Sequence, residues 1–271
     1  MYRWSSLIAV IATIGWLGFI FAAFRGFSFW YGGFVVFFWI ALGFLNYRHE
    51  SSLWLLKNRF LIFLKFYVVM IVLSFIGDLL IGQNIAHLWT YPHYAHLSDW
   101  IRLYLVLYPF GALAVLELMY LLGWVTGEKL VFHKLDHTPP IFHLLIHRFD
   151  ALLLFLILFL LVMRFFVIIG NLREIMVGLL LVWMCVGTIR LHHHLKHLRH
   201  LLGIFLATLL VSVFLHEFPN VGTYEWVYFK SPILNHQIFG IYLWVIVGWY
   251  LLVLGTLRMW MLLGADRNQY N

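Results

Sequence analysis

Long apolar runs recur along the whole of this chain, and they constrain its fold more than any other feature. The hydrocarbon core of a bilayer is about 30 Å thick, and a helix of about 20 apolar residues crosses it. Only 11% of the 271 residues are charged and 64% are apolar, which leaves too little polar surface to cover a soluble domain. Lipid offers the backbone no hydrogen-bond partners, so the spanning elements are expected to be helices. The sequence therefore predicts an all-α, polytopic membrane helix bundle.

The apolar runs and the loops between them predict eight transmembrane helices within a single transmembrane domain, residues 1–271. The first run follows Arg3 directly and is longer than the hydrophobic region of a cleaved signal peptide, so we interpret it as a span. The expected spans are residues 4–24, 27–46, 60–82, 101–125, 151–169, 174–190, 201–216 and 237–262.

Lysine and arginine residues gather in alternate loops, and this asymmetry predicts the orientation. With the N-terminus inside, twelve of them fall on the cytoplasmic side, and four, namely Arg25, Arg102, Arg173 and Lys230, fall outside. We therefore expect both termini in the cytoplasm and the protein in the cell membrane. The net charge of +7 arises from these short loops, so we expect the lipid bilayer as a partner and no nucleic acid.

The two halves of the chain, residues 1–125 and 150–262, present the same order of polar and apolar segments. Asp78 ends the third predicted span and Glu217 ends the seventh. A Trp-x-Tyr motif follows eleven residues after the first acid and nine after the second, and a long apolar run then closes each half. Because each half holds an even number of spans, the predicted pseudo-repeats are parallel and related by an axis along the membrane normal.

The acids at the outer ends of these spans are the candidates for a catalytic site. Asp78, Glu217 and the neighbouring His216 would lie at the rim of an apolar cavity, where such groups can transfer protons or bind a headgroup. That interpretation needs the Asp78 and Glu217 carboxylates within roughly 12 Å of each other. Alternatively, the acids cap helix ends and the aromatics form an interfacial belt. The expected ligand-binding residues of the two motifs are Trp89, Tyr91, Trp226 and Tyr228.

Two further charged residues fall within the predicted spans. Ionisable groups in a bilayer are costly and normally face the interior of a bundle. Glu117 lies in the fourth span and Arg164 in the fifth, at depths that an arginine side chain could nearly bridge. We expect both to face the bundle interior. They form either an interhelical ion pair, or an acid–base or ligand-binding pair that adds Glu117 to the catalytic candidates and Arg164 to the ligand-binding residues.

Ten of the 15 histidines fall on the cytoplasmic side, several of them in His-x-x-x-His pairs. Residues i and i+4 of a helix share a face, so both imidazoles of a pair can reach one metal ion. The pattern resembles the histidine boxes of membrane fatty-acid desaturases and hydroxylases. The alternative is that helices emerging among lipid headgroups simply tolerate histidine. No metal site is assigned, and the residues of the alternative site are His133, His137, His143, His147, His193, His197 and His200.

The repeated acid and Trp-x-Tyr motifs, together with Tyr108-Pro109 and the Ile238-Phe-Gly-Ile segment, resemble the membrane units of lycopene-cyclase-type and carotenoid-biosynthesis proteins. The resemblance implies a similar helical architecture and an apolar, isoprenoid ligand. The cyclases carry a Pro-x-Glu-Glu motif on the helix that follows, whereas Phe110, Gly111 and Ala112 follow Pro109 here. The resemblance therefore concerns architecture and ligand class and implies no activity.

Three functions remain open on the sequence. The first is a helix bundle that binds a lipid-like molecule, with isoprenoids as one class. The second is a histidine-rich, metal-dependent oxidoreductase acting on acyl chains, and the third is a structural subunit of a membrane complex. The chain contains no Gly-rich phosphate loop, no Gly-x-Ser-x-Gly elbow and no His-Glu-x-x-His box, so no cofactor is assigned. Polar residues are sparse in the predicted spans, and an ion channel is not expected.

Overall fold

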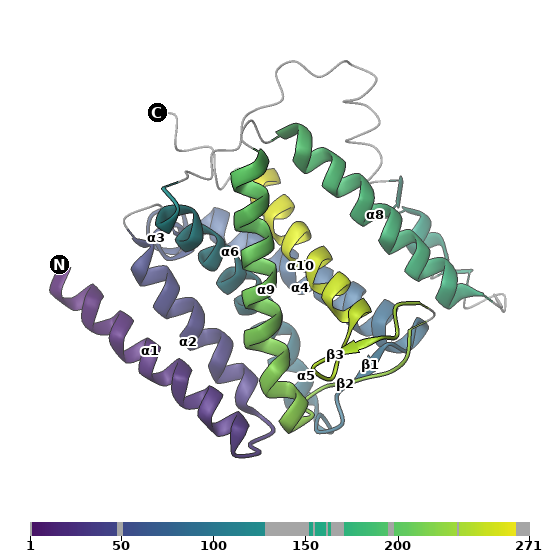
Figure 1. Cartoon of the computed structure of the whole chain (residues 1–271), viewed down its shortest axis with the longest axis horizontal. Helices are drawn as coiled ribbons and strands as arrows, with labels where there is room; N and C mark the ends of the chain where they lie inside the picture. The colour runs from purple at the N-terminus through teal and green to yellow at the C-terminus, as the bar shows by residue number, and fades with distance from the viewer. Residues whose placement is uncertain are drawn as a thin grey trace.

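The computed structural model describes residues 2–47, 51–127, 152–153, 155–160, 162–163, 171–194, 198–231 and 233–263 (Figure 1). The all-α prediction is confirmed for this part of the chain. Five of its helices are long and apolar enough to cross a membrane, and a shorter apolar helix covers Trp30–Leu45. The predicted fifth span, 151–169, is described only in part.

Helices α1 (Tyr2–Phe24) and α2 (Trp30–Leu45) form an antiparallel hairpin at one edge of the bundle (Figure 1). Their close approach depends on Gly33, because a Cβ atom there would lie 2.1 Å from the Phe19 ring. The outer face of α1 remains apolar and exposed, as at Ile14 and Phe21. A face of this kind is suited to contact with lipid.

Two long helical segments, preceded by a short helix, come next in the chain. After the short helix α3 (Ser52–Asn58), helix α4 (Phe60–Ser74) continues into η2 (Phe75–Ile85), a stretch of wide π-helix. The third apolar segment therefore ends at Ile85 and not at residue 82 as expected. The next segment begins at Leu97 and not at residue 101, as α5 (Leu97–Arg102), η3 (Leu103–Leu107) and α6 (Tyr108–Val125).

The second half contributes α8 (Leu172–His194), α9 (Leu198–Thr223) and α10 (Leu243–Leu262). Helix α9 is longer than the predicted span 201–216 because Pro219 lies inside it without ending it. A proline in a helix removes one backbone donor, and the turn beyond it can be held by side chains. Here Asn220 holds that turn by accepting from the Trp226 amide at 3.1 Å and donating to the Trp226 carbonyl at 2.9 Å.

Four short strands lie at one end of the bundle, which we call the strand end and define by residues 25–29, 86–96 and 224–242 (Figure 1). Strand β1 (Trp89–Thr90) pairs antiparallel with β2 (Val227–Tyr228). Strands β3 (Gln237–Ile238) and β4 (Ile241–Tyr242) form a hairpin. This hairpin turns through Phe239 and Gly240, which both have positive φ, and it explains why α10 begins at Leu243 and not at residue 237.

Glu117 of α6 is fully buried and joins α6 to the end of α2 and the start of α3. Its carboxylate accepts from Asn46 Nδ2 at 2.9 Å, from the Ser52 amide at 2.6 Å, and from the Ser52 hydroxyl. The side chain therefore faces the bundle interior, as expected of an acid in a transmembrane segment. Arg164, its predicted partner, lies outside the described residues.

We predict that Glu117→Ala lowers the free energy of unfolding by on the order of 3 kcal/mol, because it leaves buried donors of Asn46 and Ser52 without their acceptor. Glu117→Gln should cost less, since it keeps one acceptor oxygen. The measurement is unfolding of the purified protein in detergent micelles. Glu174→Ala, at an exposed position of α8, is the matched control. Equal stability of the Glu117→Ala and Glu174→Ala variants would contradict the prediction.

Candidate functional site

The first candidate acid, Asp78, lies in the first turn of η2 and is bound by donors on all sides. Tyr91 donates to it at 3.2 Å, Tyr104 at 2.7 Å and the Gln83 amide at 2.9 Å, and the Trp89 indole N–H donates as well. Gln83 follows the acid by five residues, the spacing that a π-helix brings to one face. The wide helix thus supplies one donor to Asp78, and the Trp-x-Tyr motif supplies two.

Glu217 is held in the same manner near the end of α9. The Trp226 indole donates to it at 3.1 Å and the Tyr228 hydroxyl at 2.7 Å. A third donor, the Trp249 indole, comes from α10 at 2.6 Å. In both halves, therefore, a buried acid accepts from the Trp and the Tyr of the motif that follows it and from one residue of the next helical segment.

The two motifs meet in the β1–β2 ladder. Trp89 is opposite Tyr228, and Thr90 is opposite Val227. Because Trp89 donates to Asp78 and Tyr228 donates to Glu217, this ladder connects the two acids through a single cross-strand pair. The four predicted ligand-binding aromatics are brought together, and their polar atoms point to the acids within the bundle. The predicted separation of the two carboxylates stays a prediction.

His216 precedes Glu217 in the chain but takes part in a different contact. It is fully buried, and its Nδ1 lies 2.5 Å from the hydroxyl of Tyr31 on α2. Aromatic rings enclose it, with centroid distances of 5.0 Å to Phe34 and 4.7 Å to Trp249. Its position at a rim, expected from the sequence, is therefore wrong: α9 continues past it, and the imidazole lies inside the bundle.

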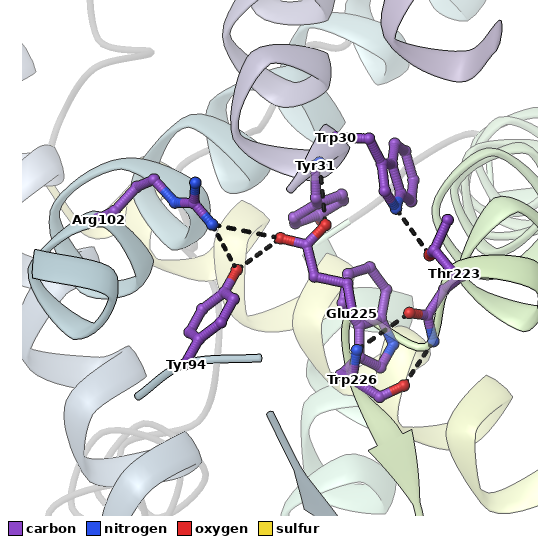
Figure 2. A network of polar contacts seen from close by, with 8 residues as sticks. Trp30, Tyr31, Tyr94, Arg102, Thr223, Glu225 and Trp226 are labelled. Carbon is purple, nitrogen blue, oxygen red and sulfur yellow. Dashed lines mark hydrogen bonds and ion pairs between the residues drawn. The ribbon is translucent and has the colours of Figure 1, made fainter. Parts of the chain in front are cut away.

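A further buried acid, Glu225, was not among the residues singled out from the sequence. Figure 2 shows it between three segments at the strand end. The Tyr94 hydroxyl donates to it at 2.5 Å, the Tyr31 amide donates at 3.1 Å, and Arg102 lies 3.7 Å away. The Arg102 guanidinium also lies 4.4 Å from the centre of the Phe29 ring. The signal in the sequence was an acid directly before Trp226 and a single arginine at a helix mouth, but nothing in the sequence indicates that they meet.

The environment of Glu225 changes its acidity. Burial raises the pKa of this carboxyl from an ordinary value of 4.5 to about 7. The Tyr94 hydrogen bond, the Tyr31 amide and the positive charge of Arg102 oppose the rise but do not cancel it. Glu225 therefore changes its protonation near neutral pH, and its attraction to Arg102 grows as it ionises.

The predicted histidine site lies almost wholly outside this description. Five of its residues lie outside the described part of the chain, namely His133, His137, His143, His147 and His197. The side chains of His193 and His200 also lie outside it. Among the side chains that the structure does describe, no group of three or more His, Cys, Asp or Glu residues could hold a metal ion. The metal alternative remains a hypothesis about the cytoplasmic segments.

We predict that the protein becomes less stable as the pH rises from about 4.5 to about 7, with a contribution from Glu225 on the order of 3 kcal/mol at most. The folded state retains the Glu225 proton up to about pH 7, whereas the unfolded chain releases it near 4.5, so rising pH favours unfolding within that window. Unfolding in detergent across this range should show a shallower slope for Glu225→Gln. The exposed acid variant Glu174→Gln should keep the wild-type slope, and an unchanged slope in Glu225→Gln would refute the prediction.

The β1–β2 register predicts a cross-link. Residues directly opposite in an antiparallel pair bring their Cβ atoms to within about 5 Å, close to the separation a disulfide needs. Thr90→Cys with Val227→Cys, in a chain whose single cysteine is replaced by Cys185→Ala, should lose both maleimide-reactive thiols on mild oxidation and regain them with reductant. Pairing Val227→Cys with Leu97→Cys, which is exposed and outside the ladder, serves as the control. Persistence of both thiols in the first variant would rule out the pairing.

Comparison with known proteins does not assign a function to this arrangement, so we infer the function from the geometry. Scans against protein-family models, curated proteins and solved structures find no match to this chain. The resemblance to lycopene-cyclase-type units therefore rests on the acid and Trp-x-Tyr motifs alone and stays a prediction.

Proposed function

We propose that this chain is a membrane protein of eight spans, built from two parallel four-helix units, that binds a lipid-like molecule between them. The isoprenoid class is favoured by the resemblance of the two acid and Trp-x-Tyr units to carotenoid-type membrane proteins. Both termini are placed in the cytoplasm by the distribution of basic residues, and the strand end then faces the opposite side.

One observation carries the two-unit architecture, namely the register of β1 with β2. A two-fold axis along the membrane normal makes equivalent strands antiparallel and pairs their central residues. Thr90 and Val227 are the middle residues of the two Trp-x-Tyr motifs, and they are opposite each other. Asp78 and Glu217 each accept hydrogen bonds from the Trp and the Tyr of the motif that follows them, and this shared pattern supports the same relation. The units 1–125 and 150–262 would therefore meet at the strand end.

The contacts around this ladder favour binding of an apolar molecule. Trp244 at the start of α10 stacks against Trp89, with centroids 6.2 Å apart, and lies edge-on to Tyr228 at 5.2 Å. Its indole nitrogen is buried and has no hydrogen-bond partner among the described residues. Aromatic faces of this kind bind apolar chains, and a free indole donor can fix a polar group of the ligand. Asp78 and Glu217 are already bound to Trp and Tyr donors. Their role in this proposal is to hold those aromatic side chains in position against the ligand.

The proposal predicts that protein purified in mild detergent carries an isoprenoid-class lipid at about one molecule per chain, detected by extraction and mass spectrometry. Trp244→Leu should reduce retention about tenfold, the equivalent of ~1.4 kcal/mol in affinity, because it removes the stacked ring and its donor. Trp124→Leu is the control. It changes an exposed tryptophan at the C-terminal end of α6, and this variant should retain the ligand.

A lipid extract identical to that of an unrelated membrane protein from the same cells would refute lipid binding. Stoichiometric iron or zinc in the same sample would instead support the histidine-rich oxidoreductase. Stable co-purifying subunits with neither lipid nor metal would support a structural role in a complex.

A further inference from the structure

Several buried polar atoms have no hydrogen-bond partner among the described residues, and three of them lie on α1 and α9: Trp16 Nε1, Ser212 Oγ and His216 Nε2. Ser212 and His216 are both fully buried, and they lie one turn apart on α9. A buried polar group without a partner is costly, and more so in a membrane, where lipid cannot supply one. Such groups normally meet a ligand or bound water.

Trp16 of α1 and His216 of α9 lie near the same aromatic residue of α2. The Trp16 ring stacks on Phe38 at 4.8 Å, and the His216 ring lies 6.4 Å from the same Phe38 ring. Helices α1 and α9 run in the same direction (Figure 1), and they touch at Phe24 and Phe218, whose rings are 6.1 Å apart.

Ser212 and His216 belong to a buried polar stripe along α9 that also contains Thr208 and Asn220. Residues four apart share one helix face, so this spacing gives a continuous stripe. Polar residues are sparse in the apolar segments, and this stripe is an exception. Thr208 donates to the carbonyl of Ile204 at 2.8 Å, and Asn220 is bound to Trp226. In the middle of the stripe, Ser212 Oγ and His216 Nε2 have no partner among the described residues.

The three groups are hydrogen-bond donors, so the ligand atom that they bind must be a hydrogen-bond acceptor. His216 Nδ1 is the only hydrogen-bond partner of the Tyr31 hydroxyl in the described chain, so this hydroxyl is best assigned as the donor to that nitrogen. A neutral imidazole that accepts at Nδ1 carries its proton on Nε2 and donates there. The Trp16 indole donates only, and the Ser212 hydroxyl can donate. Donors from two helices, beside the Phe34 and Phe38 rings of α2, fit an oxygen atom on an otherwise apolar molecule.

We propose that His216, Ser212 and Trp16 form a binding site for the carbonyl oxygen of an apolar, isoprenoid-type ketone. The site rests on the proposed lipid-binding function, and it names a polar group that the ligand must carry. A carbonyl oxygen accepts two hydrogen bonds and donates none, so it can accept from two of these three donors at once. The site lies within the helix bundle and is separate from the β1–β2 ladder.

The test uses the full-length protein in detergent, stripped of endogenous lipid, and three probes with the same chain: farnesylacetone, the corresponding alcohol and the corresponding hydrocarbon. We expect the ketone to bind about tenfold more tightly than the hydrocarbon, because it gains hydrogen bonds to otherwise unpartnered donors. Its infrared carbonyl stretch should shift to lower frequency on binding. Ser212→Ala and His216→Phe should each weaken ketone binding and leave hydrocarbon binding unchanged. Thr208→Val, on the same stripe but bonded within its own helix, should keep the wild-type preference.

Equal affinity for ketone and hydrocarbon, with no carbonyl shift, would overturn the site and assign the three atoms to bound water, while leaving the proposed lipid binding intact. Binding of none of the three probes would overturn both proposals. The mild Ser212→Ala change keeps the test decisive if His216→Phe does not fold, because an unchanged preference in Ser212→Ala also counts against the site.

Discussion

Lipid cannot form hydrogen bonds, and the structure depends on how the chain satisfies its buried acids under that constraint. A carboxylate within a bilayer needs donors from the protein itself. Asp78, Glu117, Glu217 and Glu225 are each almost wholly buried, and each accepts from residues outside its own helical turn. Each acid therefore fixes the position of the segments that supply its donors.

These acids act at both ends of the bundle. Glu117 ties α6 to the start of α3, where Ser52 supplies both its amide and its hydroxyl. At the strand end, Asp78 and Glu217 fix the two Trp-x-Tyr motifs, and Glu225 ties the second of these loops to the start of α2. The loops at the strand end are thereby ordered by buried acids as much as by their two-residue strands. This also explains why so small a ladder persists, since an isolated pair of short strands has little stability.

Full satisfaction distinguishes structural acids from groups that remain available to a ligand. Asp78 and Glu217 already accept three or more hydrogen bonds each, which suits a role in holding the aromatic side chains in place. The unpartnered atoms of the described residues include the donors of Trp244 at the strand end and of His216, Ser212 and Trp16 within the helices. Our proposals assign ligand binding to these donors, and not to the carboxylates that the sequence made most conspicuous.

The sequence by itself determined that the chain forms long apolar helices of the kind that can cross a membrane, and that an acid precedes each Trp-x-Tyr motif. These features depend on composition and on spacing along the chain, which are local. Only the tertiary structure decided that Thr90 meets Val227, that Arg102 meets Glu225, and that His216 turns into the bundle beside Tyr31. Helix α9 runs through Pro219 to Thr223, and Asn220 in its last turn is bound to Trp226, a partner that the sequence did not indicate. Which donor reaches which acceptor depends on how the helices pack, and residues distant in the chain carry no local pattern that records it.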